Sequence, residues 1–254
     1  MKQAVVLSLA AIAVLSGALS AAPALSGEET SPQPVFIKAG RLLDVEAGVI
    51  REKVMIRVED GVIKAVGGAL PVPDGARVID LSKACVLPGL IDVHTHITMQ
   101  FANFYDDLFR KSPIDQAVRA PVFARRTLEA GFTAIRDVGS AEYIDVALRK
   151  AIDEGFIPGP RIQAATMAIG ATGGHADIIG FSPYLEFRTR GGIADGVDAV
   201  RKLVRTEVKY GADLIKLIAT AGVLSEEDSA GAPQYTFEEM KAAVDEAALW
   251  GRKV

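Results

Sequence analysis

From residue 86 to its end, the chain alternates short apolar segments with amphipathic ones, and this alternation constrains the fold more than any other feature. Each apolar segment has the length and the β-branched content of a buried strand. The apolar segments are residues 86–97, 133–138, 161–168 and 213–220. Strands that alternate with helices are typical of a parallel α/β sheet, either open or closed into a barrel.

The amphipathic segments predict the helices that lie between those strands. In each of them the apolar side chains recur at helical spacing, which places one apolar stripe toward a sheet. Three helices are well marked: residues 140–152 with Ser140 as N-cap, residues 195–211, and a helix that opens with the capping box Thr236 and Glu239. A further helix is expected over 115–129, where Pro121 would interrupt it because proline lacks the N–H that a helix interior needs.

Composition divides the chain into four segments. Residues 1–26 join a positive start to an apolar run and small residues, which predicts a signal peptide and export to the periplasm or beyond; an uncleaved membrane anchor is the alternative. Residues 27–33 form a polar linker. Residues 34–85 hold β-branched runs with a hairpin turn at 59–61 and predict a small β-domain of sandwich type. Residues 86–254 remain for the α/β region.

The length of the α/β region limits how much of a barrel it can form. A closed (β/α)8 barrel, or TIM barrel, takes about 250 residues, whereas the α/β region has 169 (254 minus the first 85). The expected fold is therefore the first half of such a barrel, about four βα units. It is expected to end at the start of a fifth strand.

The charge balance and the cysteine count exclude several classes. Lys plus Arg number 28 against 32 Asp plus Glu, so the formal net charge is −4. A phosphate backbone needs a basic face, so nucleic-acid binding is not expected. Contact with a membrane is not expected either once the leader is cleaved. The single cysteine, Cys85, lies in an apolar stretch and cannot form an internal disulfide.

Two of the three histidines, His94 and His96, end an otherwise apolar strand candidate. A spacing of two residues on a strand puts both imidazoles on one face, with Cα atoms about 6.6 Å apart. That geometry allows two ring nitrogens to bind one cation. Two hydrogen-bonded histidines at a strand end are the alternative, since two unpartnered buried imidazoles would be costly.

Lys216 lies in a strand candidate that is apolar on both sides and is therefore expected to be buried on both faces. Burial disfavours the ammonium form of a lysine. A neutral amine near a metal can take up carbon dioxide as a carbamate, whose two oxygens can bridge two divalent ions. A buried ion pair with a carboxylate is the alternative.

Together these residues resemble the metal-dependent amidohydrolase superfamily. The resemblance rests on the order of a β-domain, the block LPGLIDVHTH at 87–96, four βα cycles and the strand-borne Lys216. Further blocks resemble its imidazolonepropionase-like branch, which includes exported prolidase-like dipeptidases: TAIRDVG at 133–139, TGGH at 172–175, residues 215–220 and GAPQYT at 231–236. The resemblance runs from about Val35 to Val254.

The resemblance implies a role for each candidate ligand. His94 and His96 would hold the more buried of two divalent metal ions, expected to be zinc, and carbamylated Lys216 would bridge the two. The metals would activate a hydroxide as nucleophile and polarise the scissile amide carbonyl. Asp92, on the same face, is expected to support the histidine ligands.

Four further residues receive weaker interpretations. The resemblance puts His175 in a substrate loop and lets Tyr235 touch the substrate carbonyl or carboxylate. A hydrogen-bonded loop histidine and a tyrosine that packs at a helix start are the alternatives. Arg136 and Asp137 are interpreted as structural, joined in a neighbouring ion pair.

The chain departs from the family in its ligand set. Members bring two more histidines from the fifth and sixth strands and an aspartate from the eighth, and no histidine follows His175 here. We therefore expect an N-terminal portion of an enzyme that hydrolyses C–N bonds in a small peptide or related amide. Alone it is expected to bind metal weakly and to be inactive. The exposed edge of a half barrel favours association, including a homo-oligomer.

Three alternatives stay open. Metallophosphoesterases also begin with paired histidines, although the β-domain and the buried lysine argue against that class. A hydrolase of cyclic amides or toxins would share the metal chemistry. A degenerate or split protein with a binding role would keep the fold without the activity.

Overall fold

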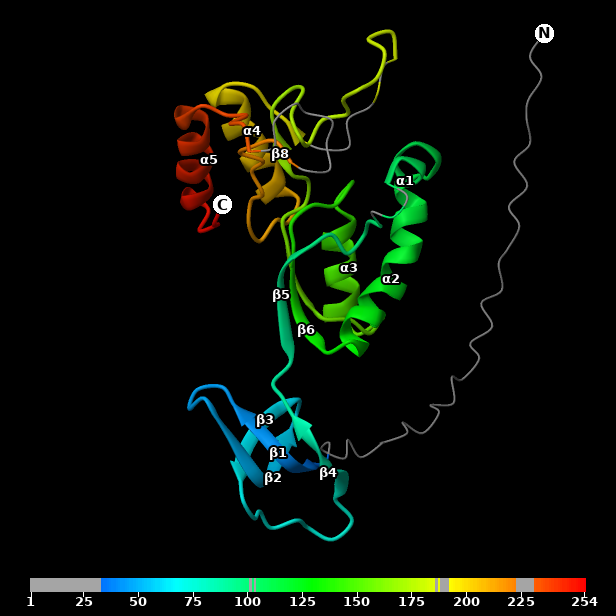
Figure 1. Ribbon diagram of the computed structural model, residues 1–254, viewed down its shortest axis with the longest axis vertical. Helices are drawn as coiled ribbons and strands as arrows, with labels where there is room; N and C mark the ends of the chain where they lie inside the picture. Colours follow the sequence, from blue (N-terminus) through cyan, green and yellow to red (C-terminus); the bar gives the residue numbers. More distant parts are fainter. Residues whose placement is uncertain (1–32, 101, 103, 186, 188–191, 223–230) are drawn as a thin grey trace, which may run out of the picture. The chain divides into compact units, whose positions relative to one another are not determined.

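The computed structural model describes residues 33–254 except 101, 103, 186, 188–191 and 223–230 (Figure 1). The expected leader and nearly all of the expected linker therefore lie outside the described residues. The chain forms two compact units, one that ends at Leu87 and one that begins at Pro88. In the described part, none of the helices has both the length and the apolarity that crossing a bilayer requires.

The first unit holds a four-stranded mixed sheet with the strand order β3-β2-β1-β4. The strands are β1 (Val35–Asp44), β2 (Val49–Glu59), β3 (Val62–Gly67) and β4 (Arg77–Val86). β2 runs antiparallel to both of its neighbours, and β4 runs parallel to β1. The sheet buries a small core, made of Ala39, Val54 and Ile56.

The hairpin predicted in this unit is confirmed. Asp60 and Gly61 connect β2 to β3, and both have left-handed backbones, with φ of 50° and 73°. Two-residue hairpin turns need positive φ at both positions. The described residues of this unit form one sheet, with no second sheet among them, so the sandwich form expected from the sequence is not seen.

The strand predicted over 86–97 is wrong at its start. Val86 is the last residue of β4, where it pairs with Leu42 of β1. Pro88 follows and has no N–H to offer a sheet ladder, so the chain leaves the first sheet there. The second unit begins its own sheet with β5 (Leu90–Thr95).

The second unit begins as the predicted succession of strands and helices. β5, β6 (Phe132–Asp137) and β7 (Arg161–Ala164) form a parallel sheet in that order. The helices α1 (Phe104–Arg110) and α2 (Pro113–Glu129) connect β5 to β6, and α3 (Ile144–Asp153) connects β6 to β7 (Figure 1). Their shared core draws on α2, α3 and the sheet, including Ala120, Ala124, Ile135, Val146 and Ile162.

Two of these helices differ from their predictions. The predicted interruption of α2 is wrong, since the helix runs through Pro121. A capping box at Ser112 and Asp115 and the burial of Ala124 against the sheet outweigh the one bond that proline removes. The start predicted for α3 at Ser140 is also wrong: the helix begins at Ile144, because the two preceding residues have left-handed backbones.

The third predicted strand is shorter than residues 161–168. β7 ends at Ala164 because Thr166 has a left-handed backbone, with φ of 64°. The Thr166 N–H donates to Oδ2 of Asp145 over 2.8 Å, and its hydroxyl donates to Glu207. The chain then resumes as β8 (Ile169–Gly170), which pairs in parallel with β9 (Gly192–Ile193).

The fourth predicted strand, residues 213–220, is not a regular strand. The Asp213 N–H donates to the carbonyl of Ala164 near one end of the segment, and the Ile218 N–H donates to the carbonyl of Ile169 near the other. Residues 165–168, which lie between these two partners in the chain, do not continue the pairing. On the other edge of the segment, the Ile215 N–H donates to the carbonyl of Lys253 over 2.8 Å. Lys253 thus lies beside this segment, where a fifth strand is expected.

The last two helices pack against each other and against β8. They are α4 (Val197–Lys209) and α5 (Phe237–Leu249), as the sequence predicts. The Thr236 hydroxyl accepts the Glu239 N–H over 3.3 Å, and the Glu239 carboxylate accepts the Thr236 N–H over 2.8 Å. Glu239 also accepts the N–H of Gly196 over 2.7 Å, so one capping residue joins the starts of both helices.

Candidate metal centre

The two strand-borne histidines lie at the carboxyl end of β5. His94 is within the strand, and His96 follows its last residue, Thr95. Their ring centroids are 5.6 Å apart, with 63° between the ring planes. The imidazoles therefore stand on one side of the sheet, as the spacing of two residues predicts. In parallel α/β folds, the carboxyl ends of the strands are where sites form.

The ring of His96 is oriented by the backbone of the next strand. Its Nδ1 lies 2.9 Å from the carbonyl oxygen of Gly139. A carbonyl can only accept, so Nδ1 carries the proton and Nε2 keeps its lone pair. Metal-binding histidines commonly make this bond with their other ring nitrogen. Glycine is needed at 139, because a Cβ there would come within 2.8 Å of the His96 Cε1.

Both imidazoles are held toward the neutral form. Burial is the main reason that the pKa of His96 lies below its ordinary value. The hydrogen bond to Gly139 raises this pKa, and the charges of His94, Lys216 and His175 lower it. Burial also lowers the pKa of His94, and the charge of Lys216 is the next cause. The neutral imidazole is the form that binds metals.

Lys216 shares this environment from the segment beyond β7. Its side chain is half-buried, and burial lowers its pKa, with the guanidinium of Arg136 as a smaller cause. Within the described residues, Lys216 forms no ion pair with a carboxylate. Its charge acts on both His94 and His96, so the structure brings the three predicted ligands within electrostatic range of one another.

The donor set fits a metal in part. Among the described residues, no three side chains of histidine, cysteine, aspartate or glutamate converge on one point. Two neutral imidazoles suit zinc, and a further donor is needed to complete its coordination. Lys216 can supply it, because a lysine with a lowered pKa is the one that loses its proton and reacts with carbon dioxide.

His175 also lies at this end of the sheet. Its backbone N–H donates to Oε1 of Gln234 over 3.1 Å. Its ring lies close to Gly222, where a Cβ would come within 2.4 Å of Cε1. Its charge is one of those that lower the pKa of His96. The loop after β8 therefore brings the third histidine within electrostatic range of His96.

Tyr235 occupies a different environment. Its side chain is 6% exposed and lies in the core with Met240, as the alternative of a packed residue at a helix start describes. Its hydroxyl donates to the carbonyl of Ala194 over 2.8 Å. Burial raises the pKa of Tyr235, so the hydroxyl keeps its proton.

The neighbouring polar residues support the backbone of β5. Oδ1 of Asp92 accepts the backbone N–H of His94 over 3.0 Å. The predicted ion pair between Arg136 and Asp137 is wrong, because Arg136 bonds Val93 of β5 and Asp137 bonds Thr95 and Ile97 instead. Arg136 Nε donates to the Val93 carbonyl over 2.7 Å. The roles of Asp137 and Gly139 were missed by sequence reasoning, although Asp137 ends β6 and Gly139 lies two residues beyond it, where such contacts arise.

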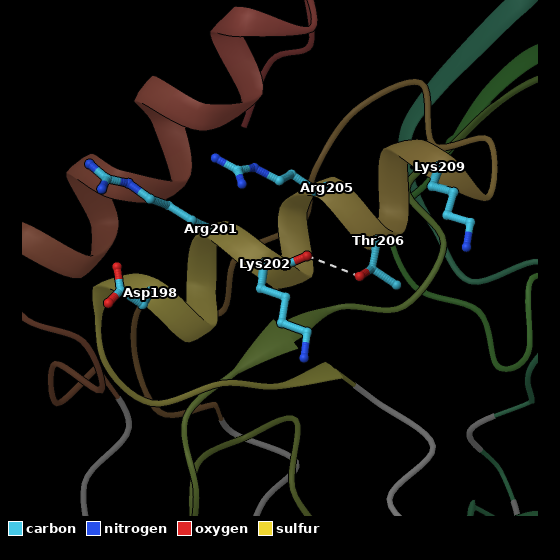
Figure 2. A pocket seen from close by; sticks show the side chains of 6 residues that line it. All are labelled: Asp198, Arg201, Lys202, Arg205, Thr206 and Lys209. Carbon is cyan, nitrogen blue, oxygen red and sulfur yellow. Dashed lines mark hydrogen bonds between the residues drawn. The ribbon is translucent and has the colours of Figure 1, made fainter.

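A shallow depression on the surface of α4 is unrelated to this centre (Figure 2). No histidine lines it, and most of its side chains are cationic. They are Asp198, Arg201, Lys202, Arg205, Thr206 and Lys209. Arg205 is already engaged, since its Nε lies 2.7 Å from Oε1 of Glu246 on α5.

Comparisons with known proteins agree with the site. A profile described as the Amidohydrolase family matches residues 85–254. Ochratoxinase of Aspergillus niger is 30% identical over 238 residues, which cover 86% of this chain and 49% of that protein. Among solved structures, a prolidase complexed with N-methylphosphonate-L-proline is 32% identical with a TM-score of 0.78, and the match covers 86% of this chain and 54% of the prolidase.

A second solved structure, a Xaa-Pro dipeptidase with methionine bound in its active site, is 34% identical with a TM-score of 0.76. That match covers 86% of this chain and 55% of the dipeptidase. The chain thus spans about half the length of these relatives. The histidine strand and Lys216 both lie within the residues that the family profile matches. The chain belongs to the amidohydrolase family.

Proposed function

We propose that this chain supplies part of a two-metal site that hydrolyses the C–N bond of a small peptide or related amide. The observation that carries the proposal is the gathering of His94, His96 and Lys216 at one end of a parallel sheet. The named activities of the relatives, an ochratoxinase, a prolidase and a dipeptidase, support the class of substrate. The second unit is then the first half of a (β/α)8 barrel.

The histidines would hold one ion through neutral ring nitrogens. His96 has an oriented ring, because the hydrogen bond to the Gly139 carbonyl fixes its tautomer. His94 is exposed and is held through its backbone N–H by Asp92. We propose zinc for both ions, since imidazole suits it.

Lys216 would bridge the ions as a carbamate. Its deprotonated Nζ forms a bond to the carbon of carbon dioxide and loses a proton, which leaves an anion with two oxygens. Burial and the nearby Arg136 both favour the deprotonated amine that this step needs. When bound, metal ions supply Lewis acidity toward an amide carbonyl and lower the pKa of water.

The test is metal analysis of the purified protein at its complete length, with and without the change Lys216→Ala. We expect the parent to carry zinc and the variant to lose most of it. Lys202→Ala is the matched control, because Lys202 is exposed on α4 (Figure 2) and should leave the metal content unchanged.

Two results would contradict the proposal. Unchanged zinc in the Lys216→Ala variant would remove the bridging role. Hydrolysis of phosphoesters without hydrolysis of any dipeptide or amide would overturn the substrate class. A preference for cyclic amides over dipeptides would keep the metal site and change only the substrate.

A further inference from the structure

We propose that Asp137, at the end of β6, is a positioning residue that fixes His96 in its metal-binding geometry. The inference about metal binding rests on the proposed function, whereas the inference about the position of His96 rests on the contacts alone. Those contacts join Asp137 to the residues on both sides of His96.

The carboxyl group of Asp137 bonds the backbone and the side chain of the histidine segment. Oδ1 accepts the N–H of Ile97 over 2.6 Å, and it lies 3.3 Å from the hydroxyl of Thr95, which donates to it. Thr95 and Ile97 are the two neighbours of His96. One oxygen atom thus holds the chain immediately before and immediately after the ring.

These bonds replace a sheet ladder that is irregular at this point. The pairing of β5 with β6 shifts register between Asp92 and Thr95, the stretch that carries His94. Beyond Thr95 the strand has ended, so the Ile97 N–H has no ladder partner and turns to the side chain of Asp137. Without that acceptor, a buried N–H would be left unpaired.

The next residues of the same block act on the ring itself. The Val138 N–H donates to the Thr95 carbonyl over 2.9 Å, and the Gly139 carbonyl accepts from Nδ1 of His96. Because Asp137 holds the backbone and Gly139 the ring, a shift at Asp137 moves the ring away from its carbonyl partner. Asp137 is fully buried, so no solvent can substitute for its oxygen.

The experiment compares Asp137→Leu with Asp145→Leu in the purified gene product. Asp145, on α3, is the matched control: both aspartates are 0% exposed, and each accepts a backbone N–H, from Thr166 in the case of Asp145. The first readout is the NMR signal of the His96 ring N–H in metal-free protein, assigned by its loss in His96→Gln. The second is the affinity for Co²⁺, followed by its visible absorption.

We expect Asp137→Leu to lose the His96 ring signal and to bind Co²⁺ about 10–100-fold more weakly. Asp145→Leu should lose thermal stability yet keep both readouts near those of the parent. An equal loss in both variants would assign Asp137 a general structural role and overturn the proposal. So would an unchanged His96 signal in Asp137→Leu.

Asp137→Asn covers the case in which the leucine variant does not fold. The amide keeps one acceptor oxygen and nearly the same volume, so the ring signal and the Co²⁺ affinity should stay close to those of the parent. Loss of both in this variant would contradict the acceptor role. A parent protein that binds no Co²⁺ would refute the proposed function, and the ring signal would still decide the position of His96.

Discussion

Gly139 lets the ring of His96 lie directly against the backbone at the end of β6. A Cβ at this position would come within 2.8 Å of the ring, too close for real contacts. We therefore expect Gly139→Ala to displace the ring and to lower the affinity for Zn²⁺ by about tenfold or more. Gly68→Ala is the control, because no atom lies within 4 Å of its Cβ position. Isothermal titration with Zn²⁺ gives both values, and equal affinities would contradict the contact.

The raised pKa of Asp137 predicts how the stability of the protein depends on pH. Burial raises its pKa from 3.8 to about 8, so between these values the folded protein holds a proton that the unfolded chain has lost. The contribution of this group to the free energy of unfolding is full below pH 3.8 and is lost as the pH rises through about 8. Its slope is at most about 1.4 kcal/mol per pH unit.

Asp137→Asn removes this titration while keeping an acceptor oxygen. The parent should lose stability between pH 5 and pH 8 more steeply than the variant, in urea unfolding measured at several values of pH. Asp145 and Glu207 also have raised pKa values, so some slope remains in both proteins. If the free energies of unfolding of the parent and of Asp137→Asn changed in parallel with pH, Asp137 would be ionised in the folded protein throughout this range.

The positions of the candidate ligands could be predicted from the sequence because they depend on local spacing. His94 and His96 share a face through strand geometry alone, and Lys216 stands in an apolar run. The bond from Ile97 to Asp137 spans 40 residues and depends on where β5 stops relative to β6. No local pattern records that register, so Asp137 was interpreted as half of an ion pair with its neighbour.

At the scale of elements, the capping box of α5 is the feature that local sequence predicted best. Thr236→Ala removes the hydroxyl that accepts the Glu239 N–H, and we expect a cost of about 1 kcal/mol in the free energy of unfolding. Thr206→Ala is the control, since that hydroxyl only bonds the Lys202 carbonyl within α4. Urea unfolding measures both variants, and equal costs would show that the cap adds nothing.

The elements that were predicted poorly are those whose ends depend on distant partners. α2 passes through Pro121 because its packing and its N-terminal cap compensate for one lost bond. The sequence around Lys216 predicts a strand. Its backbone hydrogen bonds instead fall into two groups, because the partner residues Ala164 and Ile169 belong to separate segments. An apolar run predicts that a segment is buried. Whether the segment forms a regular strand depends on a neighbouring strand that continues without a break.

At the scale of the whole molecule, we propose that residues 1–26 are removed on export. The small residues around Ala22 and Ala24 predict the cleavage site. N-terminal sequencing of protein from the periplasmic or secreted fraction should therefore begin close after one of these alanines. Protein recovered from the cytoplasm with Met1 still attached would contradict export.

Thr166 joins three separate segments through three different atoms. Its N–H bonds Asp145 on α3, its hydroxyl bonds Glu207 on α4, and its carbonyl accepts the N–H of Ser140 after β6. These bonds hold the segments that follow β6 and β7 to each other and to the helices α3 and α4. The loops that continue from these segments can therefore change in length and composition while their anchor points stay in place.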